Sequence, residues 1–220
     1  LAPDVVVVAT GSEPNLPGLV TPESDRSQSL GLQVLPEIEG LDRENVVSCD
    51  DVLSGRRKLS GGVLVVDQNG HWEAAGTAEF LADAGCRVTV IATHSLIGEN
   101  LEDGARTLFF RRAAIKAIAL RPATSLVAVE EGRVRVSAVF SGADAVGWGK
   151  YLLMPGDDEV MEGIDFVVPI IGRRSREALF LDLKASPDFA SVRIERVGDC
   201  VAPRLIQMTI AEAFELARDL

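Results

Sequence analysis

Two hydrophobic patterns alternate along this chain. Apolar runs, typical of strands buried inside a parallel sheet, occupy residues 4–11, 62–67, 87–92 and 164–172, and residues 192–200 predict a further strand that runs into Gly-Asp. Between the second and third runs, Ala74, Ala78, Leu81 and Ala82 form one helical stripe that ends before Gly85. A strand, a helix and a strand within about 30 residues predict a βαβ unit. Residues 107–120 and 204–220 are predicted to be helical as well.

The remaining pattern completes the predicted fold. Residues 125–129 and 134–140, with Glu131-Gly132 between them, predict two antiparallel strands. A Pro-, Gly- and Ser-rich stretch from Pro14 to Gly31 predicts a surface loop. The fold class is therefore α/β: a Rossmann-like parallel sheet with helices on both faces and a small antiparallel meander. Because a buried strand opens the chain, we expect its neighbouring strands upstream, in a domain truncated at the N-terminus.

Composition excludes several partners. The 220 residues are 47% hydrophobic, which is enough for a core, and carry a formal net charge of -11. An acidic protein is repelled by nucleic acid and by anionic lipid, so neither partner is expected. Cys49, Cys86 and Cys200 show no CxxC spacing, which predicts neither a metal site nor disulfides, and favours a cytoplasmic protein.

Two short motifs carry candidate nucleotide chemistry. Ala9-Thr10-Gly11-Ser12 follows the first strand, and Gly198-Asp199-Cys200 follows the last. A glycine turn lets backbone N–H groups approach a pyrophosphate, so Thr10 and Gly11 are candidate cofactor-binding residues, although a tight turn alone would look the same. Asp199, next to Gly198, can accept a ribose or ribitol hydroxyl, or cap the final helix, or both.

A second candidate site departs from the dinucleotide fingerprint. After the strand ending at Asp67, the expected G-x-G-x-x-G is replaced by Asp67-Gln68-Asn69-Gly70-His71-Trp72. Asp67 and Gly70 are the candidate cofactor-binding residues of this turn, but Asp67 would place a negative charge beside a pyrophosphate. The next strand ends in Thr93-His94, without the acidic residue that grips an NAD ribose. Both departures favour a Rossmann fold kept for its architecture over one that binds NAD(P).

Other polar residues have simpler interpretations. His71 and His94 stand alone, so structural roles are favoured over catalysis. Arg173, Arg174 and Arg176 either contact phosphate or form a solvated basic patch. No catalytic constellation is present, and we predict that the isolated chain is not catalytically competent.

The paired motifs resemble a known family. Together with Val65–Trp72, with Ala78-Glu79-Phe80-Leu81-Ala82 and with the ending Gly198–Arg204, they are similar to the C-terminal nucleotide-binding region of Old Yellow Enzyme-like NADH:flavin oxidoreductases. That family includes trimethylamine dehydrogenase, histamine dehydrogenase and 2,4-dienoyl-CoA reductase. The resemblance implies that residues 1–44 and 176–220 are the remnant of a first, FAD- or ADP-binding domain. It also implies that residues 45–175 are an inserted second, NAD(P)-binding-like domain.

The resemblance also implies a function for the parent protein. A preceding TIM barrel with FMN and an iron-sulfur cluster would oxidise a small N-methylated amine or similar substrate, while this region holds FAD or ADP. Two alternatives remain open: an NAD(P)H-dependent reductase of the 2,4-dienoyl-CoA type, and a non-catalytic interaction scaffold. The expected partners are a small-molecule nucleotide and the missing barrel, and homodimerisation is left open.

Overall fold

The computed structural model describes residues 3–15, 38–139 and 158–220. The chain divides into two compact units, the first made of Leu1–Asn15 with Gly172–Leu220 and the second of Leu16–Ile171. The domain assignment drawn from the sequence, with its bounds at 44 and 176, stays a prediction, and most of the predicted loop from Pro14 to Gly31 lies outside the described residues.

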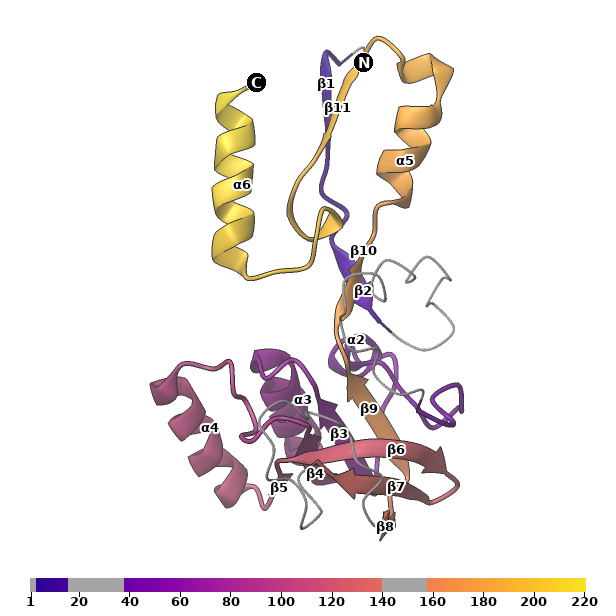
Figure 1. The fold of residues 1–220 in the computed structure, drawn as a ribbon, viewed down its shortest axis with the longest axis vertical. Coiled ribbons are helices and arrows are strands. Elements are labelled where there is room, and N and C mark those ends of the chain that lie inside the picture. The colour runs from indigo at the N-terminus through magenta and orange to yellow at the C-terminus, as the bar shows by residue number, and fades with distance from the viewer. Residues whose placement is uncertain (1–2, 16–37, 140–157) are drawn as a thin grey trace, which may run out of the picture. The chain divides into compact units, whose positions relative to one another are not determined.

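A parallel sheet forms the centre of the second unit (Figure 1). Its strands are β3 (Gly62–Asp67), β4 (Arg87–Ala92), β5 (Ala119–Arg121) and β9 (Phe166–Ile170), in the order β5-β4-β3-β9, and all neighbours run parallel. All six residues of β3 are buried, because the sheet is covered on both faces. The predicted α/β fold class is confirmed.

Three helices pack on one face of this sheet: α2 (Cys49–Leu53), α3 (Trp72–Asp83) and α4 (Asp103–Ile115). The predicted stripe on α3 buries Ala74, Ala78 and Leu81 against the sheet. The prediction of a helix to residue 120 was wrong at its end, because Ala117 adopts a φ of 54°. That conformation breaks the helix and lets the chain enter β5.

The antiparallel meander covers the opposite face of the sheet, so over the described residues the prediction of helices on both faces was wrong. It consists of β6 (Thr124–Glu130), β7 (Arg133–Ala138) and β8 (Glu159–Glu162). Leu64 and Val66 of β3 share a core cluster with Leu126 and Val134 of the meander. The two predicted strands are confirmed over the described residues, whereas Phe140 lies outside them.

The first unit contains a pair of parallel strands, β1 (Val5–Val8) and β11 (Arg193–Arg196). An antiparallel pair, β2 (Ser12–Pro14) and β10 (Arg173–Ser175), continues from it. The unit also holds helices α5 (Ala178–Ala185) and α6 (Ile206–Arg218), and the short 3-10 turns Pro187–Phe189 and Gly198–Cys200. Val8, Ile194 and Cys200 are the centre of its core cluster.

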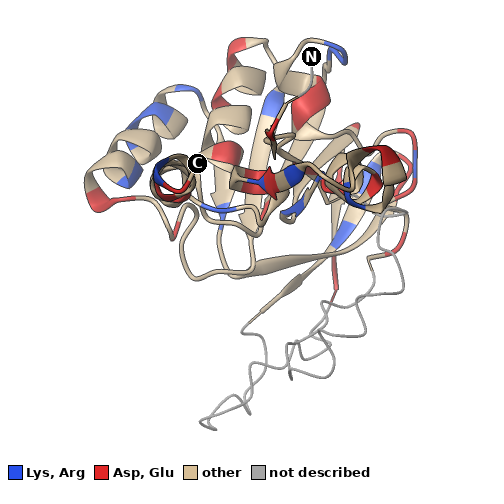
Figure 2. Ribbon diagram, turned by 90° about the horizontal axis from the view of Figure 1, so that it is seen from above, with Lys and Arg blue, Asp and Glu red and all other residues tan. Residues whose placement is uncertain are grey.

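Charged residues link helices of the second unit. Helix α3 carries acidic residues and α4 carries arginines, red and blue in Figure 2. Arg112 Nε lies 2.7 Å from Glu79 Oε2, and Lys116 Nζ, just beyond α4, lies 2.6 Å from Asp83 Oδ2. In the described part of the chain, no helix is long and apolar enough to cross a membrane.

Candidate functional site

The first unit brings the two terminal motifs together. Strands β1 and β11 pair in parallel, with Val8 opposite Arg196, and the N–H of Val197 donates to the carbonyl of Val8 at 3.0 Å. Both strands therefore end at the same edge of the sheet. Ligands of parallel α/β sheets bind at the carboxyl ends of the strands, which is where the Thr10-Gly11 and Gly198-Asp199 motifs lie.

A side-chain hydrogen bond joins the two motifs directly. Ser12 Oγ donates to Asp199 Oδ2 at 2.9 Å, and the other carboxylate oxygen accepts the backbone N–H of Arg204 at 3.4 Å. Asp199 therefore fastens the turn after β1 to the segment that leads into α6. It does not act as the N-cap of α6, because that position is held by Leu205. Ser12 was not among the residues singled out from the sequence, although it directly follows the Thr-Gly pair.

Thr10 and Gly11 differ in whether they leave room for a ligand. The Thr10 hydroxyl donates to the backbone carbonyl of Arg176, so it holds the turn. Gly11 adopts a φ of 75°, which favours glycine, and an added Cβ would meet no atom within 4 Å. The space beside Gly11 is thus open to a ligand, as a phosphate-binding turn requires.

Gly198 is engaged by the protein itself. Its backbone N–H donates to Glu212 Oε2 at 2.7 Å, and its φ is 79°. Burial alone would raise the pKa of Glu212, but the hydrogen bond from Gly198 and the ion pair with Arg204 together lower it below its ordinary value. Glu212 and Arg204 support the turn, and no short motif in the sequence points to this contact.

The three arginines after β9 lie in this same unit. Arg173 Nε donates to Ser12 Oγ at 3.0 Å. Arg174 and Arg176 both pair with Glu13, and the hydrogen bond from Arg174 is the largest effect that lowers the pKa of that carboxyl. The sequence left two interpretations of these arginines, a phosphate contact and a solvated basic patch. In the structure, Arg173 and Arg174 instead make contacts between β10 and β2.

Asp67 and Gly70, the candidate residues of the second unit, contact each other. The Asp67 side chain is 1% exposed, and its Oδ1 accepts the N–H of Gly70 at 2.7 Å. Burial raises the pKa of Asp67 and outweighs the hydrogen bonds from backbone N–H groups, which lower it. The carboxylate is therefore directed into the protein and not toward a ligand.

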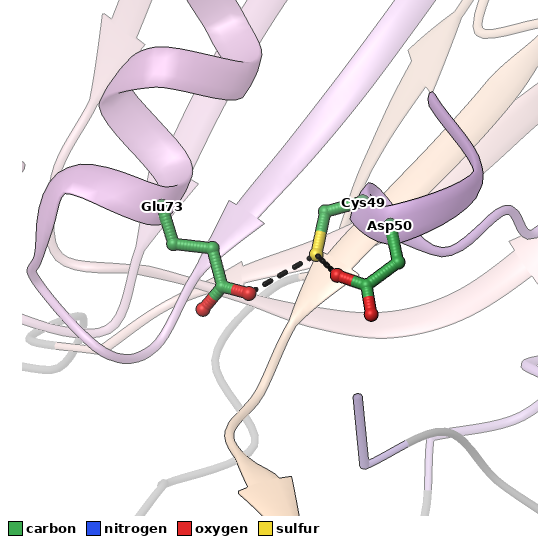
Figure 3. A group of neighbouring side chains, drawn as sticks. All are labelled: Cys49, Asp50 and Glu73. Atoms are coloured by element: carbon green, nitrogen blue, oxygen red, sulfur yellow. Dashed lines mark hydrogen bonds between the residues drawn. The ribbon is translucent and has the colours of Figure 1, made fainter. Parts of the chain in front are cut away.

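A thiol and two carboxylates meet beside the start of α3 (Figure 3). Cys49 Sγ lies 3.1 Å from Glu73 Oε1 and 3.7 Å from Asp50 Oδ1, and all three ligand atoms fall within 4.8 Å of one another. A thiolate with carboxylates is a donor set that suits zinc. Here the thiol donates to Glu73, and Asn69 donates to the other oxygen of Glu73 at 3.4 Å. These hydrogen bonds account for the arrangement, which the cysteine spacing did not predict.

No protein-family model matches the chain. The N,N-dimethylglycine/sarcosine dehydrogenase of Chromohalobacter salexigens is 26% identical over 253 residues, which cover 100% of this chain and 32% of that enzyme. The chain thus spans about a third of the length of this curated relative.

Solved structures of an amine oxidase and of a histamine dehydrogenase are also similar to this chain. The 6-hydroxypseudooxynicotine amine oxidase of Pseudomonas geniculata superposes with a TM-score of 0.76 at 25% identity, covering 96% of this chain and 28% of that one. Histamine dehydrogenase of Rhizobium sp. 4-9 also has a TM-score of 0.76, at 23% identity, covering 99% of this chain and 30% of that one. The resemblance inferred from the motifs is confirmed, because these homologues and structural neighbours are consistent with the trimethylamine dehydrogenase, histamine dehydrogenase and dienoyl-CoA reductase family.

Proposed function

We propose that this chain is the adenine-nucleotide-binding part of a flavin-dependent oxidoreductase that acts on a small N-methylated amine or a related substrate. The relatives' names support the substrate class, since they include a dehydrogenase of dimethylglycine and sarcosine, an amine oxidase and a histamine dehydrogenase. The redox step takes place elsewhere in the complete protein, at a flavin. The residues of this chain bind and position the nucleotide.

One observation carries the proposal: the Thr10-Gly11-Ser12 turn and Asp199 meet at the carboxyl ends of two parallel strands. The open space beside Gly11 admits a phosphate oxygen to the backbone. The Asp199 carboxylate keeps acceptor capacity beyond its two present hydrogen bonds, so it can accept a ribose or ribitol hydroxyl. FAD and ADP share this recognition chemistry.

Isothermal titration of the 220-residue chain with ADP, FAD, NADH and NADPH tests the proposal, together with an absorbance spectrum for copurified flavin. We expect ADP or FAD to bind and the Asp199→Asn variant to bind about tenfold more weakly, which corresponds to about 1.4 kcal/mol for one lost charged hydrogen bond. The matched control is Asp188→Asn, at an exposed aspartate of the same unit. Equal ADP binding by both variants would contradict the assigned role of Asp199, and no nucleotide binding at all would favour the scaffold alternative.

A further inference from the structure

Asp67 ends β3 where a dinucleotide-binding unit presents its glycine turn. Its two carboxylate oxygens accept backbone N–H groups from two separate segments: Gly70 at 2.7 Å, in the turn before α3, and Gly98 at 3.3 Å, in the loop after β4. In a working fingerprint, backbone N–H groups of such a turn are directed at the pyrophosphate. Here an internal carboxylate receives them.

The loop after β4 also lies directly against the turn. The backbone N–H of Asn100 donates to the carbonyl of Gly70 at 2.9 Å, and the Asn100 side chain donates to the carbonyl of Asn69 at 2.8 Å. An added Cβ at Gly70 would meet the backbone nitrogens of Asn100 and Glu99 at 3.1 and 3.2 Å. This crowding contrasts with Gly11 of the first unit, whose surroundings are open over the same 4 Å.

The charges near the turn oppose an anion as well. Glu73 lies in the first turn of α3, where a helix normally favours negative charge, and so supplies that charge from within the chain. Asp50 lies near it, within the trio of Figure 3. A pyrophosphate placed at the start of α3 would meet these carboxylates and would have to displace Asp67 from its two N–H donors.

We propose that Asp67 is an intramolecular substitute for the phosphate of a dinucleotide. With residues 98–100 it fills the place above the β3–α3 turn, and this excludes nicotinamide dinucleotides from the second unit. Asp67 is thus a specificity-determining residue that acts through the backbone it holds. The inference goes beyond the proposed function and does not depend on it, because it concerns only contacts within the second unit.

Nuclear magnetic resonance of the full chain tests whether nicotinamide dinucleotides are excluded from the second unit. Amide signals of Gly70 and Gly98 report the second unit, and those of Gly11 and Gly198 report the first. On titration with NADH or NADPH to about 1 mM, where a complex with a Kd of ~1 mM is half saturated, we expect no shift at Gly70 or Gly98. Saturable shifts of both signals would overturn the proposal. Shifts with ADP at Gly11 and Gly198 bear only on the first unit, so failure of either proposal is recognised separately.

Chemical rescue tests the role of the carboxylate. The Asp67→Ala variant leaves both N–H donors without their acceptor, and formate is a small carboxylate that can occupy the vacated space. We expect formate to raise the Tm of Asp67→Ala more than that of Asp42→Ala, a control at an exposed aspartate of the same unit. Equal responses of the two variants would overturn the substitute role. If Asp67→Ala does not fold, the titration of the unsubstituted chain still decides between exclusion and binding.

Discussion

Ser12 and Asp199 are 187 positions apart, and their side chains form a hydrogen bond of 2.9 Å. The bond closes the first unit by tying the turn after β1 to the turn after β11. Because parallel pairing of these strands places both turns at one edge, the contact is a direct consequence of the strand register. The same contact orients the carboxylate that we assign to nucleotide binding.

A double-mutant cycle measures this contact. Replacing Ser12 by Ala removes the donor of a partly buried hydrogen bond, and replacing Asp199 by Asn removes the charge of its acceptor. We expect each to lower the free energy of unfolding by about 1 kcal/mol. Because the two residues interact directly, the double variant should lose less than the sum of the two single losses. Urea unfolding followed by circular dichroism gives the three values.

Ser60→Ala is the control for this cycle, since Ser60 is exposed. It should change the free energy of unfolding by less than about 0.5 kcal/mol. Strict additivity of Ser12→Ala and Asp199→Asn would show that the two side chains do not interact in solution.

The Glu212→Gln variant should lose stability in a pH-dependent way. The pKa of Glu212 lies below its ordinary value of 4.5, so the ionised form is favoured in the folded state. Its contribution is fully present above pH 4.5 and is lost as the pH falls through the lowered pKa. At neutral pH we expect the variant to be less stable by on the order of 1 kcal/mol, because the acceptor for Gly198 loses its charge.

The difference between wild type and Glu212→Gln should shrink toward acid pH, as measured by urea unfolding at several pH values. The control is Glu215→Gln, at an exposed position of the same helix. A difference that stays constant between neutral pH and pH 3 would rule out the proposed ion pair and hydrogen bond as its source.

Much of the fold follows from local pattern. The runs Gly62–Asp67 and Arg87–Ala92 are rich in β-branched residues and become strands with those bounds, because a strand buried on both faces needs no polar alternation. The helix around Ala78 follows from its apolar stripe. The end of α4 could not be predicted in this way, because Ala117 takes a left-handed conformation. Such a conformation is usually indicated by a glycine, and no glycine stands next to this residue.

Less of the candidate site could be predicted from the sequence. Thr10, Gly11, Gly198 and Asp199 were named from short motifs, and their cofactor roles stay predictions. Ser12, Arg204 and Glu212 were missed because their partners are distant in sequence, and pairing of that kind depends on tertiary structure. The departure from the glycine fingerprint predicts that the second unit does not bind a dinucleotide in the ordinary way, but only the structure shows Gly98 contacting Asp67.

Asp67 should show the opposite pH dependence to Glu212. Its pKa is raised, so between its ordinary value of 3.8 and the raised value the folded state binds a proton that the unfolded state does not. The stability of the wild type relative to Asp67→Asn should therefore rise as the pH falls through this window. Each unit of pKa elevation contributes about 1.4 kcal/mol.

Urea unfolding of both proteins across this window checks the slope, with Asp42→Asn as the control at an exposed aspartate. His94 is the charged side chain that acts on Asp67, and its positive charge lowers the pKa of that carboxyl. The comparison is therefore repeated in a His94→Gln background. A difference that falls toward acid pH in both backgrounds would mean that Asp67 is stabilised as a charge.

Two isoleucines of the first unit should respond very differently to truncation. Ile194 on β11 is 2% exposed and packs in the core cluster with Val8 and Cys200, whereas Ile210 on α6 is 62% exposed. Removing buried methylene groups leaves a cavity, so Ile194→Ala should cost about 2–5 kcal/mol. Ile210→Ala should change the free energy of unfolding by less than about 0.5 kcal/mol, because its side chain is in water in both states. Thermal unfolding of the two variants measures the contrast, and a large loss for Ile210→Ala would mean that α6 buries this face against another surface in solution.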